Sequence, residues 1–280
     1  MLGILNKFRK PKKPVAIVTP IYRLPLTEHE EVSLRHLRHY LSGYDRFIVA
    51  PKKLEGLALD FPDFKLTCFE DSYFESIFGY NKLMLSTEFY AAFSDYEYVL
   101  IYQLDCLVFS SDLEAWCHKK WDYVGAPWFE KYQNDPSAGL WGVGNGGLSL
   151  RHIQHSLEAL KAKAKIERMV LKEIGTESLE RNDPATRSAI KKFFKKQGLE
   201  NDPKWFLGRP VKNEDRFWGF EASQLVSKFH VPTPQEALGF SFECAPRYCF
   251  DENNSQLPFG CHAWARYDLE FWKPYLLGTA

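Results

Sequence analysis

Short apolar runs alternate with amphipathic stretches through the first 110 residues. The stretches between the runs have the apolar spacing of helices, notably residues 76–93, and Thr27 with Glu30 forms a capping-box pattern that predicts a helix to about Leu41. Buried strands are predicted for the apolar runs at residues 14–19, 46–50, 64–69 and 96–105. Strands that alternate with helices indicate an α/β protein whose mostly parallel sheet is covered on both faces.

The second half of the chain has a less regular pattern. Residues 139–147 contain five glycines around Asn145. Asn-Gly is a strong signal for a tight hairpin, although glycines also let a backbone approach a ligand closely. Two charged helical stretches are predicted over residues 152–198, interrupted near 182–184, and a further helix over residues 216–229. Because no linker separates the two halves, we expect one compact unit with two lobes.

Charge is balanced overall but segregated along the chain. There are 36 basic and 36 acidic side chains, so the formal net charge is zero, which argues against a strongly cationic nucleic-acid binder. Residues 151–210 nevertheless carry a net charge of +6, and residues 1–13 hold five basic side chains and no acid. This tail also contains apolar residues, so we expect an amphipathic segment on an anionic membrane surface or, equally, a solubilising end.

The sequence gives no sign of a membrane span or a secretory signal. Its six cysteines are scattered, as is typical of reduced thiols in a cytosolic protein, and the spacing of Cys244, Cys249 and Cys261 fits no zinc pattern. We therefore expect a cytoplasmic protein. The histidines of the first predicted helix are expected to face solvent; they are His29, His36 and His39.

Single polar residues near the predicted strand ends are candidates for chemistry. Asp105 follows the clearest strand, and ligands of parallel sheets bind outside the carboxyl ends of the strands. A carboxylate there suits a divalent cation on a diphosphate, or simply a turn. His262 could ligate a metal or touch a phosphate, and Lys82 could lie beside a diphosphate, but an ordinary position is open for each.

Two adjacent acids, Glu214 and Asp215, precede the helix predicted over residues 216–229. A carboxylate at this place can act as a general base toward a hydroxyl nucleophile. It can equally belong to a helix N-terminus, with Asn213 or Asp215 as the cap and Glu214 stabilised by the helix dipole. The local pattern leaves both roles open.

Five short motifs, taken in order, carry a resemblance. They are Tyr98–Asp105, Tyr123–Trp128, Gly144–Arg151, Glu214–Trp218 and Pro258–Trp264. Together they resemble glycosyltransferases of the GT-A fold, and more narrowly a bacterial family of uncharacterised sugar-nucleotide-type transferases catalogued as a domain of unknown function. The similarity runs from about residue 14 to residue 270. It implies a GT-A-like, Rossmann-type sheet flanked by helices, with an irregular acceptor-side C-terminal lobe and a helical insertion.

The resemblance also implies a division of the chain. Residues 14–110 would form the nucleotide-binding half, and residues 111–280 the donor-sugar and acceptor half of the same domain. The helical insertion would span about residues 152–210, and residues 1–13 would be the basic amphipathic tail.

Roles for the donor-binding residues follow from the same resemblance. Thr19 and Tyr22 would border the nucleotide base, and Asn81 with Lys82 would reach the diphosphate. The turn made by Asn145, Gly146 and Gly147 would line the donor sugar.

The metal site implied by the resemblance is incomplete. Gln103 and Asp105 fall where GT-A enzymes carry Asp-x-Asp, in which the last acid binds the metal and the first faces the ribose. His262 matches the C-terminal histidine that completes the coordination of Mn²⁺ or Mg²⁺. Because Gln103 replaces the first acid, metal independence is a second expectation.

The acidic pair matches the position of the catalytic base in inverting GT-A enzymes. Asp215 is the preferred base and Glu214 the alternative. Aromatic residues make up 16% of the chain, which suits a cleft that stacks on rings. The candidates for stacking on acceptor or donor sugars are Trp128, Trp141, Trp218 and Trp264, each of which could equally be a core residue.

The resulting hypothesis is an inverting glycosyltransferase. It would transfer a sugar from a nucleotide-sugar donor to a hydroxyl of a glycan or lipid-linked acceptor, in surface-polysaccharide or other glycan assembly, and bind no nucleic acid. It would be cytoplasmic, with peripheral attachment to the inner face of the membrane through residues 1–13. Two alternatives stay open: a sugar nucleotidyltransferase, and a non-catalytic glycan- or nucleotide-binding protein on a degenerate GT-A fold.

Overall fold

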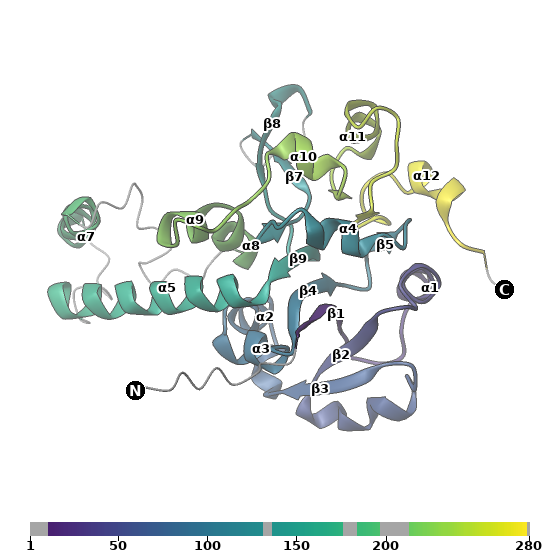
Figure 1. Cartoon of the computed structure of the whole chain (residues 1–280), viewed down its shortest axis with the longest axis horizontal. Helices are drawn as coiled ribbons and strands as arrows, with labels where there is room; N and C mark the ends of the chain where they lie inside the picture. Colours follow the sequence, from purple (N-terminus) through teal and green to yellow (C-terminus); the bar gives the residue numbers. More distant parts are fainter. Residues whose placement is uncertain (1–10, 131–135, 176–183, 197–212, 279–280) are drawn as a thin grey trace, which may run out of the picture.

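A six-stranded sheet forms the centre of the molecule (Figure 1). The computed structural model describes residues 11–130, 136–175, 184–196 and 213–278. The strand order is β3-β2-β1-β4-β9-β6, and only β9 runs against the other strands. The strands are β1 (Lys13–Pro20), β2 (Asp45–Pro51), β3 (Lys65–Phe69), β4 (Tyr96–Tyr102), β6 (Tyr123–Val124) and β9 (Leu148–His152). The predicted α/β class with a mostly parallel sheet is therefore confirmed.

Helices lie on both sides of this sheet. In Figure 1, α1 (Glu28–Tyr40) lies to the right of the sheet, and α2 (Ile77–Met84), α3 (Thr87–Ala92) and the start of α5 (Ile153–Ile174) lie to its left. The capping box predicted for α1 is present, since the Thr27 side chain accepts from the Glu30 amide and the Glu30 side chain accepts from the Thr27 amide. Coverage on both sides explains why six of the seven residues of β4 are buried.

The helical stretch predicted over residues 76–93 is two helices. Ser86 caps the second of them, because its hydroxyl accepts a hydrogen bond from the amide of Phe89. A side chain that bonds the backbone in this way favours a new N-terminus over a continuous helix. The break lies between Met84 and Thr87.

Short strands and helices build the second lobe. One small sheet joins β5 (Leu107–Val108), β10 (Ser241–Phe242) and β11 (Gly260–Cys261), and a second pairs β7 (Pro127–Phe129) with β8 (Leu140–Val143). The remaining short helices are α4 (Leu113–His118), α8 (Glu214–Arg216), α9 (Ala222–Leu225), α10 (Pro234–Leu238), α11 (Pro246–Glu252) and α12 (Leu269–Trp272).

Residues 144–147 do not form the tight hairpin that Asn-Gly suggested. β8 pairs with β7, whereas β9 joins the main sheet beside β4 and β6, so this segment connects two sheets. Asn145 has φ of +66°, which asparagine tolerates better than most side chains.

The helix expected over residues 216–229 begins earlier and ends earlier. It starts with α8, continues through a π-helical turn at Phe217–Glu221, and ends with α9 at Leu225. Helix α7 (Pro184–Lys196) and α5 confirm the two charged helical stretches. Parts of the predicted insertion, at 176–183 and 197–212, and residues 1–10 of the predicted tail lie outside the described residues.

His36 corrects the expectation that the histidines of the first helix are solvated. It is fully buried, its Nδ1 lies 2.9 Å from the carbonyl of Val108, and its Nε2 accepts from the amide of Leu277 at 3.0 Å. Burial lowers the pKa of His36. All six cysteines are free thiols. Over the described part of the chain, no helix is long and apolar enough to cross a membrane.

Candidate functional site

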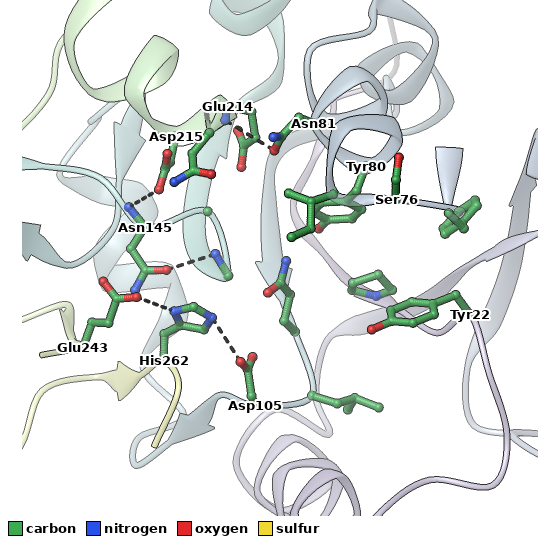
Figure 2. Close-up of a pocket in the computed structure, with 18 of the residues that line it drawn as sticks. Tyr22, Ser76, Tyr80, Asn81, Asp105, Asn145, Glu214, Asp215, Glu243 and His262 are labelled. Atoms are coloured by element: carbon green, nitrogen blue, oxygen red, sulfur yellow. Dashed lines mark hydrogen bonds and ion pairs between the residues drawn. The ribbon is translucent and has the colours of Figure 1, made fainter. Parts of the chain in front are cut away.

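A cavity of about 700 Å³ opens where β1 and β4 end (Figure 2). Figure 2 shows Asp215 and Glu214 along one edge, Asp105, His262 and Glu243 along another, and Tyr22 with Tyr80 on the side of the first lobe. Ligands of open parallel sheets bind at this end of the strands. The place predicted for Asp105 from the strand pattern is therefore where the cavity lies.

The connection between β8 and β9 joins the two charged edges of the cavity. The side-chain oxygen of Asn145 accepts from the amide of Gly147 at 3.1 Å, and the Gly147 carbonyl accepts from the amide of Gln103 at 2.9 Å. A Cβ added to Gly147 would lie 2.3 Å from the His262 ring, and one added to Gly146 would lie 2.0 Å from Oε1 of Glu214. Both positions therefore require glycine for close approach.

Asp215 is held by backbone amides. Its Oδ2 accepts from the amide of Asn145 at 3.1 Å and its Oδ1 from the amide of Arg216 at 2.8 Å. Burial, followed by the negative charges of Glu214 and Glu243, raises the pKa of Asp215 to about 7. A carboxyl that faces a cavity with a pKa near neutral pH is suited to accept a proton there.

Glu214 has a different environment from its neighbour. It is 3% exposed, and its two oxygens accept from both terminal nitrogens of the fully buried Arg151, at 2.9 and 2.8 Å. Arg151 also donates to the hydroxyl of Tyr90 at 3.0 Å. A two-bond arginine–carboxylate pair keeps both charges satisfied in the interior. Both oxygens of Glu214 are therefore engaged by Arg151, whereas Asp215 accepts from backbone amides.

Arg151 had no predicted role, although it ends the strand motif Gly144–Arg151. The signal in the sequence was a single cation after Leu148-Ser149-Leu150, just before the predicted helix. Nothing local in that run identifies an acid 63 positions away as its partner.

His262 lies between two carboxylates. Its Nε2 is 3.3 Å from Oδ2 of Asp105 and its Nδ1 is 3.1 Å from Oε1 of Glu243. Burial alone would lower the pKa of His262, but the hydrogen bonds and charges of Asp105 and Glu243 outweigh it and raise the pKa to about 10. The ring is therefore an imidazolium at neutral pH. Glu243 was not predicted, because it follows the apolar strand β10 without any motif around it.

The donor atoms of this cluster fit a divalent cation. Ligand atoms of Asp105, Cys106 and His262 lie within 4.8 Å of one another. Burial raises the pKa of the Cys106 thiol well above its usual range, and its sulfur donates to the Gly147 carbonyl at 3.3 Å, so Cys106 is a poor ligand. Carboxylate oxygens and an imidazole nitrogen remain, and half of the Asp105 side chain is exposed to the cavity side.

The other predicted donor residues divide into two groups. Tyr22, Asn81 and Gln103 line the cavity, and Asn81 accepts from the amide of Glu214 at 3.4 Å. Thr19 and Lys82 are not among the described residues of the lining. Thr19 is fully buried within β1, and the exposed Lys82 ammonium lies 4.6 Å from the centre of the Phe78 ring.

None of the four predicted stacking tryptophans is among the described residues that line the cavity. Trp218 and Trp264 are at most 1% exposed, which corrects the expectation that they stack on sugars, because a buried ring has no face open to a ligand. Trp128 and Trp141 each stack on Phe220, at centroid distances of 5.5 and 4.6 Å. The wall of the cavity instead uses other aromatic side chains, namely Tyr22, Phe74 and Tyr80.

Comparison with solved structures finds glycosyltransferases at low identity. Mouse xyloside xylosyltransferase 1 has a TM-score of 0.47 at 11% identity, over 89% of this chain and 97% of that one. A glycosyltransferase for the major capsid of PBCV-1 has 0.43 at 13%, over 89% and 93%. The glycosyltransferase GlyE of Streptococcus pneumoniae TIGR4 has 0.44 at 14%, over 96% of this chain and only 61% of that one. At such scores the likeness does not extend to activity.

Comparison at the level of sequence gives a family. No curated protein matches the chain. Residues 63–262 match a protein family of unknown function, DUF5672. These 200 of 280 residues include both charged edges of the cavity. The chain therefore belongs to the DUF5672 family.

Proposed function

We propose that this protein is a glycosyltransferase of the GT-A type that moves a sugar from a nucleotide-sugar donor to a hydroxyl acceptor with inversion. The observation that carries the proposal is that one cavity holds the carboxyl of Asp215, bonded to two backbone amides, and the ring of His262, held between Asp105 and Glu243. One group can accept the proton of the nucleophile, and the other can stabilise the charge of a leaving group.

Asp215 acts as the general base in this proposal. An acceptor hydroxyl is a weak nucleophile until its proton is removed during attack. The two amides of Asn145 and Arg216 fix the direction of the carboxylate, so it needs no reorganisation when the acceptor binds. Attack from the side opposite the nucleoside diphosphate inverts the anomeric carbon.

The leaving nucleoside diphosphate is stabilised at the other edge of the cavity. Asp105 and His262, the latter after loss of its ring proton, would hold a Mn²⁺ or Mg²⁺ ion, which would neutralise charge on the diphosphate. The metal-independent alternative uses the same residues: the imidazolium of His262, kept charged by Asp105 and Glu243, faces the diphosphate directly. Gln103 at the place of the first acid of Asp-x-Asp favours this alternative.

The nucleoside is proposed to bind against the aromatic wall of the first lobe. Tyr22 is 54% exposed and lies on the same side of the cavity as Tyr80 (Figure 2), and Phe74 also lines the cavity. Exposed aromatic rings bind flat bases by stacking. The amide side chains of Asn81 and Asn145 line the space between this wall and Asp215, where the diphosphate and the sugar would lie.

Donor turnover tests the proposal. UDP-, GDP-, dTDP- and CMP-sugars are incubated with the protein, with and without Mn²⁺, and the free nucleotide is measured, which is the nucleoside diphosphate for the first three donors and CMP for the last. We expect release from at least one donor. Asp215→Asn should lower transfer by about 10²–10⁴-fold, the usual contribution of a general base, and leave the donor dissociation constant unchanged. Full activity in Asp215→Asn would remove this residue as the base.

The same assay, extended to nucleoside triphosphates with sugar phosphates, separates the two alternative functions. A sugar nucleotidyltransferase would release pyrophosphate from a nucleoside triphosphate and a sugar phosphate. A non-catalytic binding protein would gain thermal stability with a nucleotide and turn over none. Donor hydrolysis or transfer excludes the non-catalytic binding protein. Failure of every donor to bind or react contradicts the glycosyltransferase proposal.

We also propose that the protein works at an anionic membrane surface on a lipid-linked acceptor, on the cytoplasmic side. The support is the charge pattern: five basic side chains beside apolar ones in residues 1–13, and a net +6 over residues 151–210.

A further inference from the structure

A second cluster of metal-ligating side chains lies at the far end of β9 from the cavity. Asp122 precedes β6, His152 ends β9, and His155 is in the first turn of α5. In the pairing of β9 with β4, Leu148 lies opposite Tyr102 and His152 opposite Tyr98. Four residues of strand separate the two ends, which is about 13 Å. The cluster is therefore a distinct place, outside the cavity.

The three side chains converge on one point. One ring nitrogen of each histidine and one oxygen of Asp122 all lie within 4.8 Å of one another. Nδ1 of His155 is 2.5 Å from Oδ1 of Asp122, and the two imidazole rings have centroids 4.1 Å apart. Glu97 approaches from the neighbouring strand β4, with Oε1 3.9 Å from Nε2 of His152.

The backbone fixes Asp122 in this arrangement. Its side chain is 2% exposed, and its Oδ2 accepts from the amide of His230 at 2.7 Å, so Oδ1 is the oxygen turned to the histidines. Its own amide donates to the His230 carbonyl, and its carbonyl accepts from the amide of His152. A carboxylate oriented by backbone bonds is preorganised for a cation.

We propose that Asp122, His152 and His155, with Glu97 as the fourth ligand, form a Zn²⁺ site. Two imidazoles with carboxylate oxygens are a usual ligand set for zinc, and a site with two imidazole nitrogens favours Zn²⁺ over Mg²⁺ and Ca²⁺. The side chains of His152 and His155 are 15% and 33% exposed, which gives the ion a path from solvent. Bound zinc joins β6, β9 and the start of α5, and stabilises this junction of the main sheet.

Zinc binding by the full-length protein is the test. The protein is treated with a chelator, dialysed, and titrated with Zn²⁺ by calorimetry, with stoichiometry read by native mass spectrometry. Because Asp105 and His262 could also hold a metal, the titration is repeated in His262→Asn. We expect one Zn²⁺ to remain bound in that variant, with a rise in Tm when zinc is added.

Two variants remove the proposed ligands with little change in the fold. His152→Asn keeps a favoured N-cap for α5, where the His152 ring now accepts from the amide of His155. His155→Gln keeps an amide donor for Asp122. Each should weaken this zinc binding by more than about tenfold, the effect of disturbing even an outer partner of a zinc site, and abolish the zinc-induced rise in Tm.

An exposed histidine provides the matched control. His118, at the end of α4, lies outside both metal-ligating groups, and His118→Gln should bind zinc as the unchanged protein does. If His262→Asn binds no zinc, or if His152→Asn and His155→Gln bind it as tightly as the control, the proposal is wrong and the Asp122–His155 contact is only a hydrogen bond.

Discussion

The adjacent acids Glu214 and Asp215 have different surroundings. Glu214 is paired with the guanidinium of Arg151, whereas Asp215 accepts from two backbone amides and lies near two other carboxylates. Both side chains line the cavity, but the oxygens of Glu214 also reach Arg151 at the end of β9. Two acids that are equivalent in the sequence therefore have different partners in the structure.

The raised pKa of Asp215 predicts how activity depends on pH. A general base works only when it is deprotonated, so kcat/KM should rise as pH increases toward about 7 and then level off. The measurement is transfer by the unchanged protein between pH 5 and 9. A profile flat down to pH 5 would contradict a base with this pKa.

The raised pKa of Asp215 also predicts that stability falls as pH increases, whereas activity rises. A carboxyl whose pKa is higher in the folded than in the unfolded state stabilises the fold at low pH and loses that contribution as pH rises through about 7. Asp215→Asn should therefore have a higher Tm than the unchanged protein at pH 8, by several degrees. The gap should shrink as the pH is lowered toward 4.5, and a constant gap would mean that Asp215 is not strained by its charge.

Removal of one member of the buried pair should be costly. Glu214→Gln leaves the Arg151 charge without its carboxylate, and we expect the free energy of unfolding to fall by about 3–5 kcal/mol in urea titrations. The exposed pair of Lys273 and Glu270 is the control, and Glu270→Gln should change it by less than about 1 kcal/mol. Equal effects of the two variants would show that burial of the Arg151–Glu214 pair does not affect the free energy of unfolding.

Several site residues could be predicted singly, but their partners could not. Asp105 lies in the cavity as its place at a strand end predicted, and Asn145, Asp215 and His262 lie there as the resemblance to GT-A glycosyltransferases implied. Glu243 and Arg151 were missed, since each is one polar residue in an apolar run and acquires its role only through contacts with distant segments.

At the scale of elements, the local sequence pattern predicted the strands and helices that depend on interactions within a few residues. The four strands through residue 105 and the capped helix α1 follow from apolar spacing and from a side-chain bond within one turn. The connection at Asn145 did not, because strand pairing depends on which distant strands lie beside β8 and β9. For Trp218 and Trp264 the core alternative holds instead of sugar stacking, because composition does not specify which aromatic residues enter the core.

The packing of the β8–β9 connection predicts the effect of one methyl group. In Gly147→Ala the new Cβ would overlap the His262 ring, which Asp105 and Glu243 hold from both sides. We expect the ring to be displaced, with a fall in transfer activity of at least tenfold and a loss of about 1–3 kcal/mol in the free energy of unfolding.

A matched glycine separates this effect from a general cost of substitution. Gly43 has open space around its Cβ position, so Gly43→Ala should leave both activity and stability near those of the unchanged protein. If Gly147→Ala behaves like Gly43→Ala, the close contact with His262 does not matter to the reaction.

At the scale of the whole molecule, the net charge is zero, but basic side chains are concentrated in one part of the structure. Helices α5 and α7 belong to the segment of residues 151–210 with net +6, and Figure 1 shows both at the left of the molecule, with α5 extending beyond the main sheet. A chain with this separation of charge can face an anionic surface with one side and keep an acidic cavity on another.

Deletion of residues 1–13 tests the membrane proposal. We expect the truncated protein to co-sediment with phosphatidylserine-containing vesicles several-fold less than the full chain, because each basic residue near such a surface contributes about 1 kcal/mol. Neutral phosphatidylcholine vesicles and 0.5 M salt are the controls, since the attraction is electrostatic. Unchanged co-sedimentation would contradict a role for the tail.

The Arg151–Glu214 pair also has an evolutionary consequence. The buried guanidinium of Arg151 bonds to Tyr90 and to Glu214. Loss of Arg151 alone would therefore leave the buried Glu214 carboxylate without its cation. Substitutions at these positions should therefore have been accepted together or not at all. Among homologues, an apolar residue in place of Arg151 should be accompanied by the loss of the acid at 214, while the acid at 215, as the proposed base, should be retained in both cases.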